Sequence, residues 1–323
     1  MPTQAPFAVR TLQRAGATPL GLPLVRLIAG LARHALVPPG LACRAIEELA
    51  SRASDTRIVV PVDLDPTHRI VLELDLSIVG CVEVLARTPG RSNERPSLEL
   101  FRALVRDAAT VFDIGANVGL FTYAAACYAP DAVVRAYEPT PALASLIRRN
   151  LALNGWAGRA NVRGEGVSAV SGALPFYVHA IDVESSFESR RAPATGAAGA
   201  ITVPVVALDD VFESEDIDPA RTVCKIDVEG HEMKVLDGLE RTLSRPTGRP
   251  TLLMEFLGRA ITEERIIERV LEYGLDVYYV STRPPVRLRS TADFVPVQEL
   301  GQWNFLLTDR PLPGQLVVSR RRD

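Results

Sequence analysis

The sequence predicts an α/β fold in which helices cover both faces of a doubly wound, mostly parallel β-sheet. From residue 110 onward, short apolar segments rich in β-branched residues alternate with helical patterns, which is typical of such sheets. Two glycines, Gly115 and Gly119, stand where the first of these strands passes into a helix. With 323 residues, the chain has room for one large α/β domain and an additional element.

The additional element is expected in residues 1–96, as an N-terminal helical and β-hairpin extension. Four apolar residues recur there at helical spacing and indicate a packing helix, with a membrane-surface anchor as the alternative: Leu24, Leu27, Ile28 and Leu31. A second helical patch covers residues 43–51. The strands 58–64 and 70–75 flank the turn residues 65–68, which predicts a hairpin.

A second domain is predicted in residues 97–323, after the polar boundary stretch 88–96. Residues 178–201 lack periodicity and indicate a loop or lid, whose polar start at 182–187 suits substrate hydroxyls or is a plain surface loop. The predicted strands are 111–114, 133–136, 160–167, 203–208, 222–227, 250–256, 276–280 and 303–308, and helices are expected near 97–107, 120–126, 141–151, 209, 235–243 and 262.

The composition argues against several classes of partner. The net charge is −3 at pH 7, so the chain lacks the positive surplus typical of nucleic-acid-binding proteins. No apolar run reaches the roughly 18 residues of a membrane-spanning helix, and no secretory signal pattern is apparent. The four cysteines are scattered without a C-x-x-C pair, which argues against a zinc site or a disulfide framework. We therefore expect a cytoplasmic protein with a small-molecule partner, and a homo-oligomer is left open.

The turn after the first strand of the sheet predicts a ligand site. Gly115 and Gly119 allow a ligand to approach the backbone closely, and the free N–H groups of the helix start attract a carboxylate or phosphate. Asp113 and Asn117 supply directional polar contacts. Glu138 lies 25 positions after Asp113 (138 − 113), at the end of the next strand, where a carboxylate suits the hydroxyls of a ribose.

Three sequence blocks together resemble one family. D-I-G-A-N-V-G-L-F begins at Asp113, Y-E-P ends at Pro139, and K-I-D-V-E-G-H-E begins at Lys225. With the later Leu253-Met254-Glu255, they resemble the FkbM-like methyltransferases over roughly residues 98–282.

That resemblance implies a Rossmann-like, seven-stranded class I methyltransferase domain that uses S-adenosylmethionine (SAM). It implies O-methylation of a hydroxyl on a sugar, a glycoside or another small metabolite. The cofactor contacts that it implies come from the glycine turn, from Glu138 and Pro139, from Val167 and Ser168 near the adenine, and from Asp227.

Methylation of a hydroxyl requires a group that removes or polarises its proton. The candidates are Lys225, Asp227, Glu229, His231 and Glu255. Asp227 ends a strand whose residues Cys224 and Ile226 are apolar, with helix capping as the alternative. His231 would titrate near neutral pH, or merely opens a helix as an exposed residue. Lys225 shares a sheet face with Asp227 and is either a base or its ion-pair partner.

Glu229 and Glu255 are candidates with structural alternatives, as a first-turn acid and as an acid at the sheet end. Three carboxylates, those of Asp227, Glu229 and Glu255, could hold a divalent ion, although this is not the favoured interpretation. Two other functions stay open. One is methylation of an amine or carboxylate, which would not require Asp227 or His231 as a base. The other is a non-catalytic SAM-binding or scaffold module.

Overall fold

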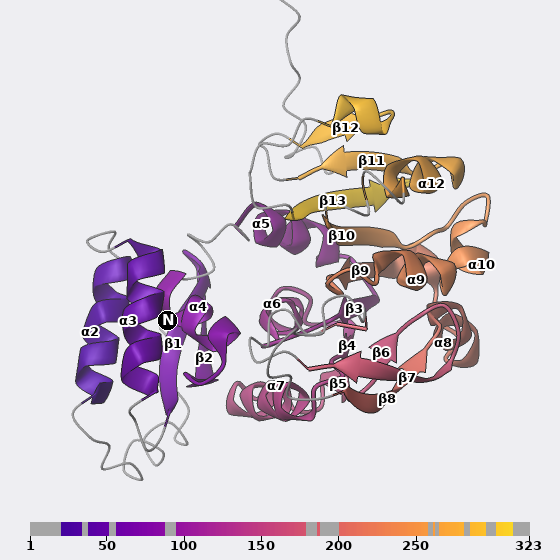
Figure 1. Cartoon of the computed structure of the whole chain (residues 1–323). Coiled ribbons are helices and arrows are strands. Elements are labelled where there is room, and N and C mark those ends of the chain that lie inside the picture. The colour runs from indigo at the N-terminus through magenta and orange to yellow at the C-terminus, as the bar shows by residue number, and fades with distance from the viewer. Residues whose placement is uncertain are drawn as a thin grey trace, which may run out of the picture. The chain divides into compact units, whose positions relative to one another are not determined.

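The computed structural model describes residues 21–33, 38–51, 56–87, 95–178, 186–187, 200–257, 261, 265–280, 285–294 and 302–312. The chain packs into two compact units (Figure 1): residues 1–92 with 149–155, and residues 93–148 with 156–323. The polar residues 182–185 and the helix start predicted at 262 lie outside the described ranges.

The first unit combines helices with a hairpin. Its described elements are α2 (Gly21–Arg33), α3 (Pro39–Ala50), β1 (Arg57–Asp65), β2 (His68–Asp75) and α4 (Val79–Arg87), of which α4 was not predicted. Antiparallel pairing of β1 with β2 confirms the hairpin. The apolar stripe predicted for α2 is wrong, because Leu27 is 57% exposed whereas Val25, Ala29 and Ala32 are buried. These small side chains let α2 pack closely against α3 and α4.

Two asparagines of the segment 149–155, which begins in the last turn of helix α7 (Pro141–Leu153), satisfy the backbone of β2 in this unit. Asn154 accepts a hydrogen bond from the N–H of Val71 at 2.9 Å and donates to its carbonyl at 2.7 Å. Asn150, which is completely buried, does the same for Glu73 at 2.6 and 2.9 Å. Each carboxamide therefore pairs with the strand much as a neighbouring strand would.

The second unit is built on an eight-stranded sheet with the order β12-β11-β13-β10-β9-β3-β4-β5. Its elements are α5 (Arg95–Val105), β3 (Thr110–Ile114), α6 (Leu120–Tyr128), β4 (Val133–Tyr137), α7 (Pro141–Leu153), β5 (Ala160–Arg163), α8 (Leu208–Ser214), β9 (Thr222–Ile226), α9 (Glu232–Asp237), α10 (Glu240–Leu243), β10 (Thr251–Leu257), α12 (Ile266–Glu272), β11 (Asp276–Tyr279), β12 (Val286–Leu288) and β13 (Gln302–Thr308).

The predicted doubly wound, mostly parallel sheet is confirmed. Strands β10, β9, β3, β4 and β5 are parallel, and β13 is antiparallel to β10 and β11. The short strand β12 adds an eighth strand to the predicted seven by pairing with β11. The chain runs outward from β3 to β5 and returns at β9, so the switch point, where ligands bind in such sheets, lies between β3 and β9.

Two predicted elements are divided in the structure. The strand expected at 160–167 splits into β5 and β6 (Gly166–Val167), and β6 joins β7 (Gly172–Tyr177) and β8 (Ala200–Val206) in a separate three-stranded sheet. The helix expected at 235–243 is divided into α9 and α10. Gly238 lies between them, where a Cβ would stand 2.1 Å from the carbonyl oxygen of Ser168.

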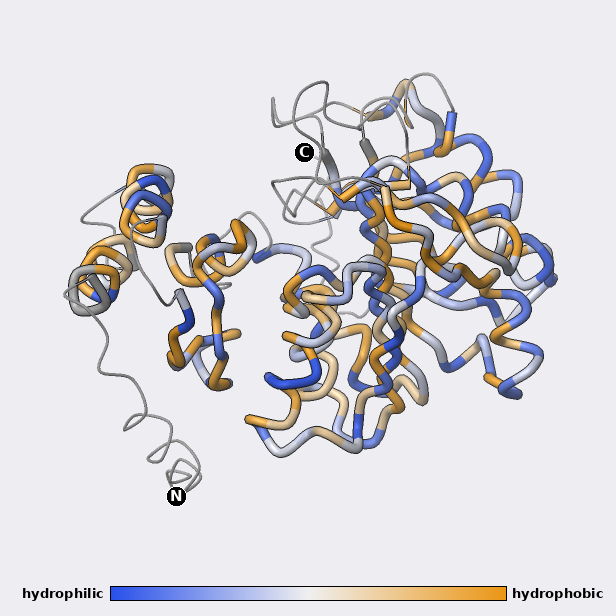
Figure 2. Tube along the Cα trace, turned by 60° about the horizontal axis from the view of Figure 1, so that its bottom comes forward, coloured by the Kyte–Doolittle hydropathy of each residue, from blue (hydrophilic) through white to orange (hydrophobic). Residues whose placement is uncertain are grey.

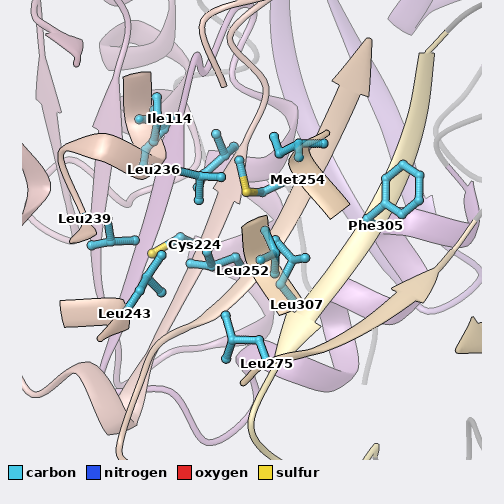
Figure 3. Packing of buried hydrophobic residues seen from close by; sticks show 14 of the residues in the cluster. Ile114, Cys224, Leu236, Leu239, Leu243, Leu252, Met254, Leu275, Phe305 and Leu307 are labelled. Atoms are coloured by element: carbon cyan, nitrogen blue, oxygen red, sulfur yellow. The ribbon is translucent and has the colours of Figure 1, made fainter. Parts of the chain in front are cut away.

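Alternation along the central strands separates an apolar face from a polar one. Cys224 of β9 and Met254 of β10 enter the hydrophobic core (Figure 3). The same core contains Ile226 of β9 and apolar residues of α8, α9, α10 and α12. In Figure 2, the central strands are mainly hydrophobic and many of the outer turns are hydrophilic. On β9, the intervening Lys225 points to the opposite face, where its ammonium lies 5.1 Å from the centre of the Phe121 ring of α6.

Candidate functional site

The glycine turn after β3 requires glycine for two physical reasons. Gly115 and Gly119 have φ values of 76° and 91°, in the left-handed region that glycine tolerates best. A Cβ on Gly115 would stand 1.9 Å from the carbonyl oxygen of Asp227, and one on Gly119 would stand 2.7 Å from the Tyr123 side chain. The backbone of the turn at Gly115 therefore packs directly against the backbone at the end of β9, with no room for a side chain between them.

A small cavity of about 50 Å³ opens at this switch point. Its walls come from the ends of β3, β4 and β9, from the start of α7, and from the second sheet. The lining residues are Ile114, Gly115, Asn117, Tyr137, Glu138, Pro139, Thr140, Leu143, Gly166, Val167, Phe176, Phe187, Asp227, Val228 and Glu229.

The structure brings most of the predicted cofactor residues to this cavity. Six of them line it: Gly115, Asn117, Glu138, Pro139, Val167 and Asp227. Asp113, Gly119 and Ser168 are not among the lining residues. Asp113 is buried and accepts a hydrogen bond from the Thr122 hydroxyl at 2.5 Å, so it fastens α6 to β3. Burial raises the pKa of Asp113 to about 6.

Glu138 organises the turn from the neighbouring strand. Its two carboxylate oxygens accept hydrogen bonds from the N–H groups of Asn117 and Thr140, each at 2.8 Å. The side chain is 4% exposed, and burial raises its pKa to about 7 in spite of these hydrogen bonds. Each oxygen keeps one further lone pair, which can accept a hydroxyl of a ligand.

Asp227 and Lys225 form an ion pair at the end of β9. The Lys225 ammonium is 3.2 Å from an Asp227 carboxylate oxygen. Lys225 is 1% exposed, whereas the Asp227 side chain is 32% exposed and lines the cavity. Asp227 is thus positioned to meet a ligand, and Lys225 holds it in place from below.

His231 opens a helix, as one sequence-based alternative expected, but it is buried and not exposed. It stands at the N-cap position of α9 but is only 6% exposed. Its Nε2 lies 3.0 Å from the Ser168 hydroxyl, and its ring centre lies 4.9 Å from that of Phe187. His231 is not among the cavity-lining residues, so it supports Phe187 from behind.

Two further candidates lie on opposite sides of Asp227. Glu229 lines the cavity with a φ of 53°, and its carbonyl accepts a hydrogen bond from the Ser186 hydroxyl at 2.8 Å. Glu255 is 8% exposed and accepts a hydrogen bond from Asn304 at 3.4 Å. Within the described ranges, no three His, Cys, Asp or Glu side chains gather closely enough to hold a metal ion.

The site also contains residues that were not predicted. Tyr137, Phe176 and Asn304 were not singled out as site residues, and Phe187 was placed only in a candidate substrate loop. The Y-E-P block is a signal that could have drawn attention to Tyr137. The other three depend on contacts between distant segments, for which the sequence carries no local signal.

A doubly wound sheet with a glycine turn after β3 and an acid at the tip of β4 is the arrangement of class I methyltransferases. The chain belongs to the FkbM methyltransferase family, because residues 113–278 match the methyltransferase FkbM domain. Among the helices of the described segments, none is both long and apolar enough to cross a membrane.

Two curated relatives match the chain over part of their length. Hexuronic acid methyltransferase AglP of Haloferax volcanii is 27% identical over 165 residues, which are 51% of this chain and 64% of the relative. Methyltransferase 1 of Beauveria bassiana is 30% identical over 148 residues, 42% of this chain and 59% of the relative. The chain therefore spans less than two thirds of each relative. An O-methyltransferase from Bacillus cereus, solved in complex with SAH, aligns at 14% identity with a TM-score of 0.39, over 65% of this chain and 79% of that one.

Proposed function

We propose that this protein is a SAM-dependent O-methyltransferase acting on a hydroxyl of a sugar, a glycoside or another small metabolite. The observation that carries the proposal is the cavity at the switch point. It brings together the glycine turn, the Glu138 carboxylate and the Asp227 carboxylate at the ends of β3, β4 and β9. The cytoplasmic location of the protein and the absence of a nucleic-acid partner stay predictions from the sequence, which leaves a homo-oligomer open.

The lining residues fit a nucleoside with a charged tail. Asn117 lines the cavity, and its Oδ1 is buried with no hydrogen-bond partner within the described part of the chain. Leaving such an atom unsatisfied costs about 1–3 kcal/mol, so a ligand that donates a hydrogen bond to it is favoured. Glu138 would accept the ribose hydroxyls, and Val167, Phe176 and Phe187 offer an apolar wall to a flat base.

Asp227 is the proposed base. SAM held by the glycine turn and Glu138 would supply an electrophilic methyl group on a positively charged sulfur, and its transfer to the acceptor oxygen would leave the C–S electron pair on the sulfur. Asp227 takes the hydroxyl proton, because it is the partly exposed carboxylate at the end of β9. Lys225 fixes the orientation of Asp227 through their ion pair, and Glu229 shapes the adjoining wall.

A sugar-type acceptor is favoured by the relative named as a hexuronic acid methyltransferase. The hydroxyls of sugars are weak nucleophiles and need a base to take their proton. The Asp227 carboxylate lies where the acceptor is proposed to bind, so it can serve as that base. The proposal concerns the acceptor class and makes no choice among individual sugars.

Calorimetric titration of the purified protein with SAM tests the cofactor assignment. We expect saturable one-to-one binding, weakened at least about tenfold in Glu138→Ala, because charge-assisted hydrogen bonds to the ribose are lost. A matched control is Glu215→Ala, since Glu215 binds Arg135 outside the cavity. The absence of binding at millimolar SAM would overturn the proposal.

A further inference from the structure

The polar face of the central sheet carries one more row of side chains, beyond the cofactor cavity. Leu253 of β10 lies beside Lys225 of β9, so Glu255, two residues further along, lies beside Asp227. Glu255 is in turn paired with Asn304 of β13. Because side chains two residues apart share a face, Asp227, Glu255 and Asn304 form a row across three neighbouring strands. We call this row the acceptor row.

Asn304 is the least satisfied member of the acceptor row. The residue is 9% exposed, and its Nδ2 donates to Glu255 Oε2 at 3.4 Å. Its Oδ1 is buried without a hydrogen-bond partner among the described residues. This orientation pairs the amide donor of Asn304 with an acceptor oxygen of an ionised Glu255. The row therefore contains a buried acceptor that requires a donor from outside the row.

At the opposite end of strands β10 and β13, the buried polar side chains are hydrogen-bonded to each other. Thr251 of β10 and Thr308 of β13 are both 3% exposed, and their hydroxyls hydrogen-bond to each other at 3.3 Å. The β10–β13 ladder thus satisfies its buried polar pair at the end away from Asp227. Among the described residues of these two strands, the unsatisfied acceptor lies at the end beside the proposed base, where a substrate would bind.

We propose that Glu255 and Asn304 bind the hydroxyls next to the one that is methylated, so that the acceptor is a polyhydroxylated ring such as a hexose. Asn304 Oδ1 accepts a hydrogen bond from one such hydroxyl, and Glu255 accepts from another. Neighbouring strands are about 4.8 Å apart, a spacing over which one sugar ring can meet several side chains of the row. Asn304 is a positioning residue here, and this inference rests on the proposed methyltransferase activity.

The test removes the proposed hydrogen bond to Asn304 in two ways, by deleting a hydroxyl from the sugar and by replacing Asn304. Transfer of labelled methyl from SAM is measured with methyl glucopyranoside, methyl glucuronide and their monodeoxy analogues as acceptors. For wild-type protein, we expect one deoxy analogue to lose about 2- to 13-fold in kcat/KM, the value of a single hydrogen bond. Asn304→Leu should lower kcat/KM for the parent glycoside to the same level, mainly by raising KM. It should not lower kcat/KM for that deoxy analogue any further.

Thr308→Val is the matched control, since it removes a buried polar pair from the same strands. It should leave KM for every glycoside unchanged, and both variants should bind SAM like the wild type, which also shows that they fold. Equal effects of Asn304→Leu and Thr308→Val, or an additive effect of Asn304→Leu and the deoxy sugar, would refute the inference. So would SAM binding without methylation of any glycoside in the panel. Absence of SAM binding by the wild type would instead refute the proposed function itself.

Discussion

The buried Glu138 carboxylate makes a quantitative prediction about how SAM binding depends on pH. Its pKa is raised by burial from 4.5 to about 7, so a large part of the free protein carries a protonated Glu138 at neutral pH. Ribose hydroxyls donate to a carboxylate more strongly than to a carboxylic acid. SAM should therefore bind best to the ionised form, and its affinity should rise with pH.

The size of the effect follows from the pKa. If only the ionised form binds, the apparent dissociation constant is multiplied by 1 + 10^(7 − pH), with 7 taken from the raised pKa. This factor is about 11 at pH 6 and about 1.1 at pH 8, so binding should tighten up to about tenfold between them. Glu138→Gln, which does not titrate, should lose this dependence.

Calorimetry of SAM binding from pH 6 to pH 8, in both proteins, is the assay. The amino group of SAM and Asp113, whose pKa is about 6, titrate in both proteins and cancel in the comparison. Identical slopes for wild type and Glu138→Gln would refute the assignment of Glu138 to the ribose.

The same pKa predicts the stability of the ligand-free protein. A carboxyl whose pKa is higher in the folded state binds more protons when folded, so its contribution is present below pH 4.5 and is lost as the pH rises through about 7. The shift of about 2.5 units corresponds to about 3 kcal/mol. Urea unfolding should therefore show wild type losing stability from pH 5 to pH 8 more steeply than Glu138→Gln.

Three further substitutions test the turn, the base and the first unit. Gly115→Ala forces a Cβ against the Asp227 carbonyl and should cost about 1–3 kcal/mol or more in urea unfolding, whereas Gly164→Ala, with no atom within 4 Å of its Cβ, should cost far less. Asp227→Asn should lower kcat about 100-fold or more while SAM still binds, and retention of full kcat would exclude Asp227 as the base. Asn154→Ala leaves the N–H and C=O of Val71 unpaired and should cost about 1–3 kcal/mol, and an unchanged urea midpoint would contradict this role.

Sequence patterns predicted the strands that carry the site, and they placed Glu138 and Asp227 at strand ends. These features depend on local periodicity, on turn chemistry and on the family resemblance. Local patterns could not distinguish Asp113, which is buried against Thr122, from Asp227, which lines the cavity. Both acids stand at the ends of apolar strands, and only packing decides which one meets a ligand.

The sequence by itself determined the doubly wound fold, the glycine turn and the family. These follow from the alternation of strands with helices, from the left-handed backbone that Gly115 and Gly119 supply, and from the order of the three blocks.

Only the tertiary structure decided which side chains share a site. His231 lies behind Phe187, and Asn304 lies beside Glu255 from 49 positions away along the chain. The physical reason is strand register: one face of β9 and β10 enters the apolar core, and the polar groups of distant strands are thereby brought together on the other.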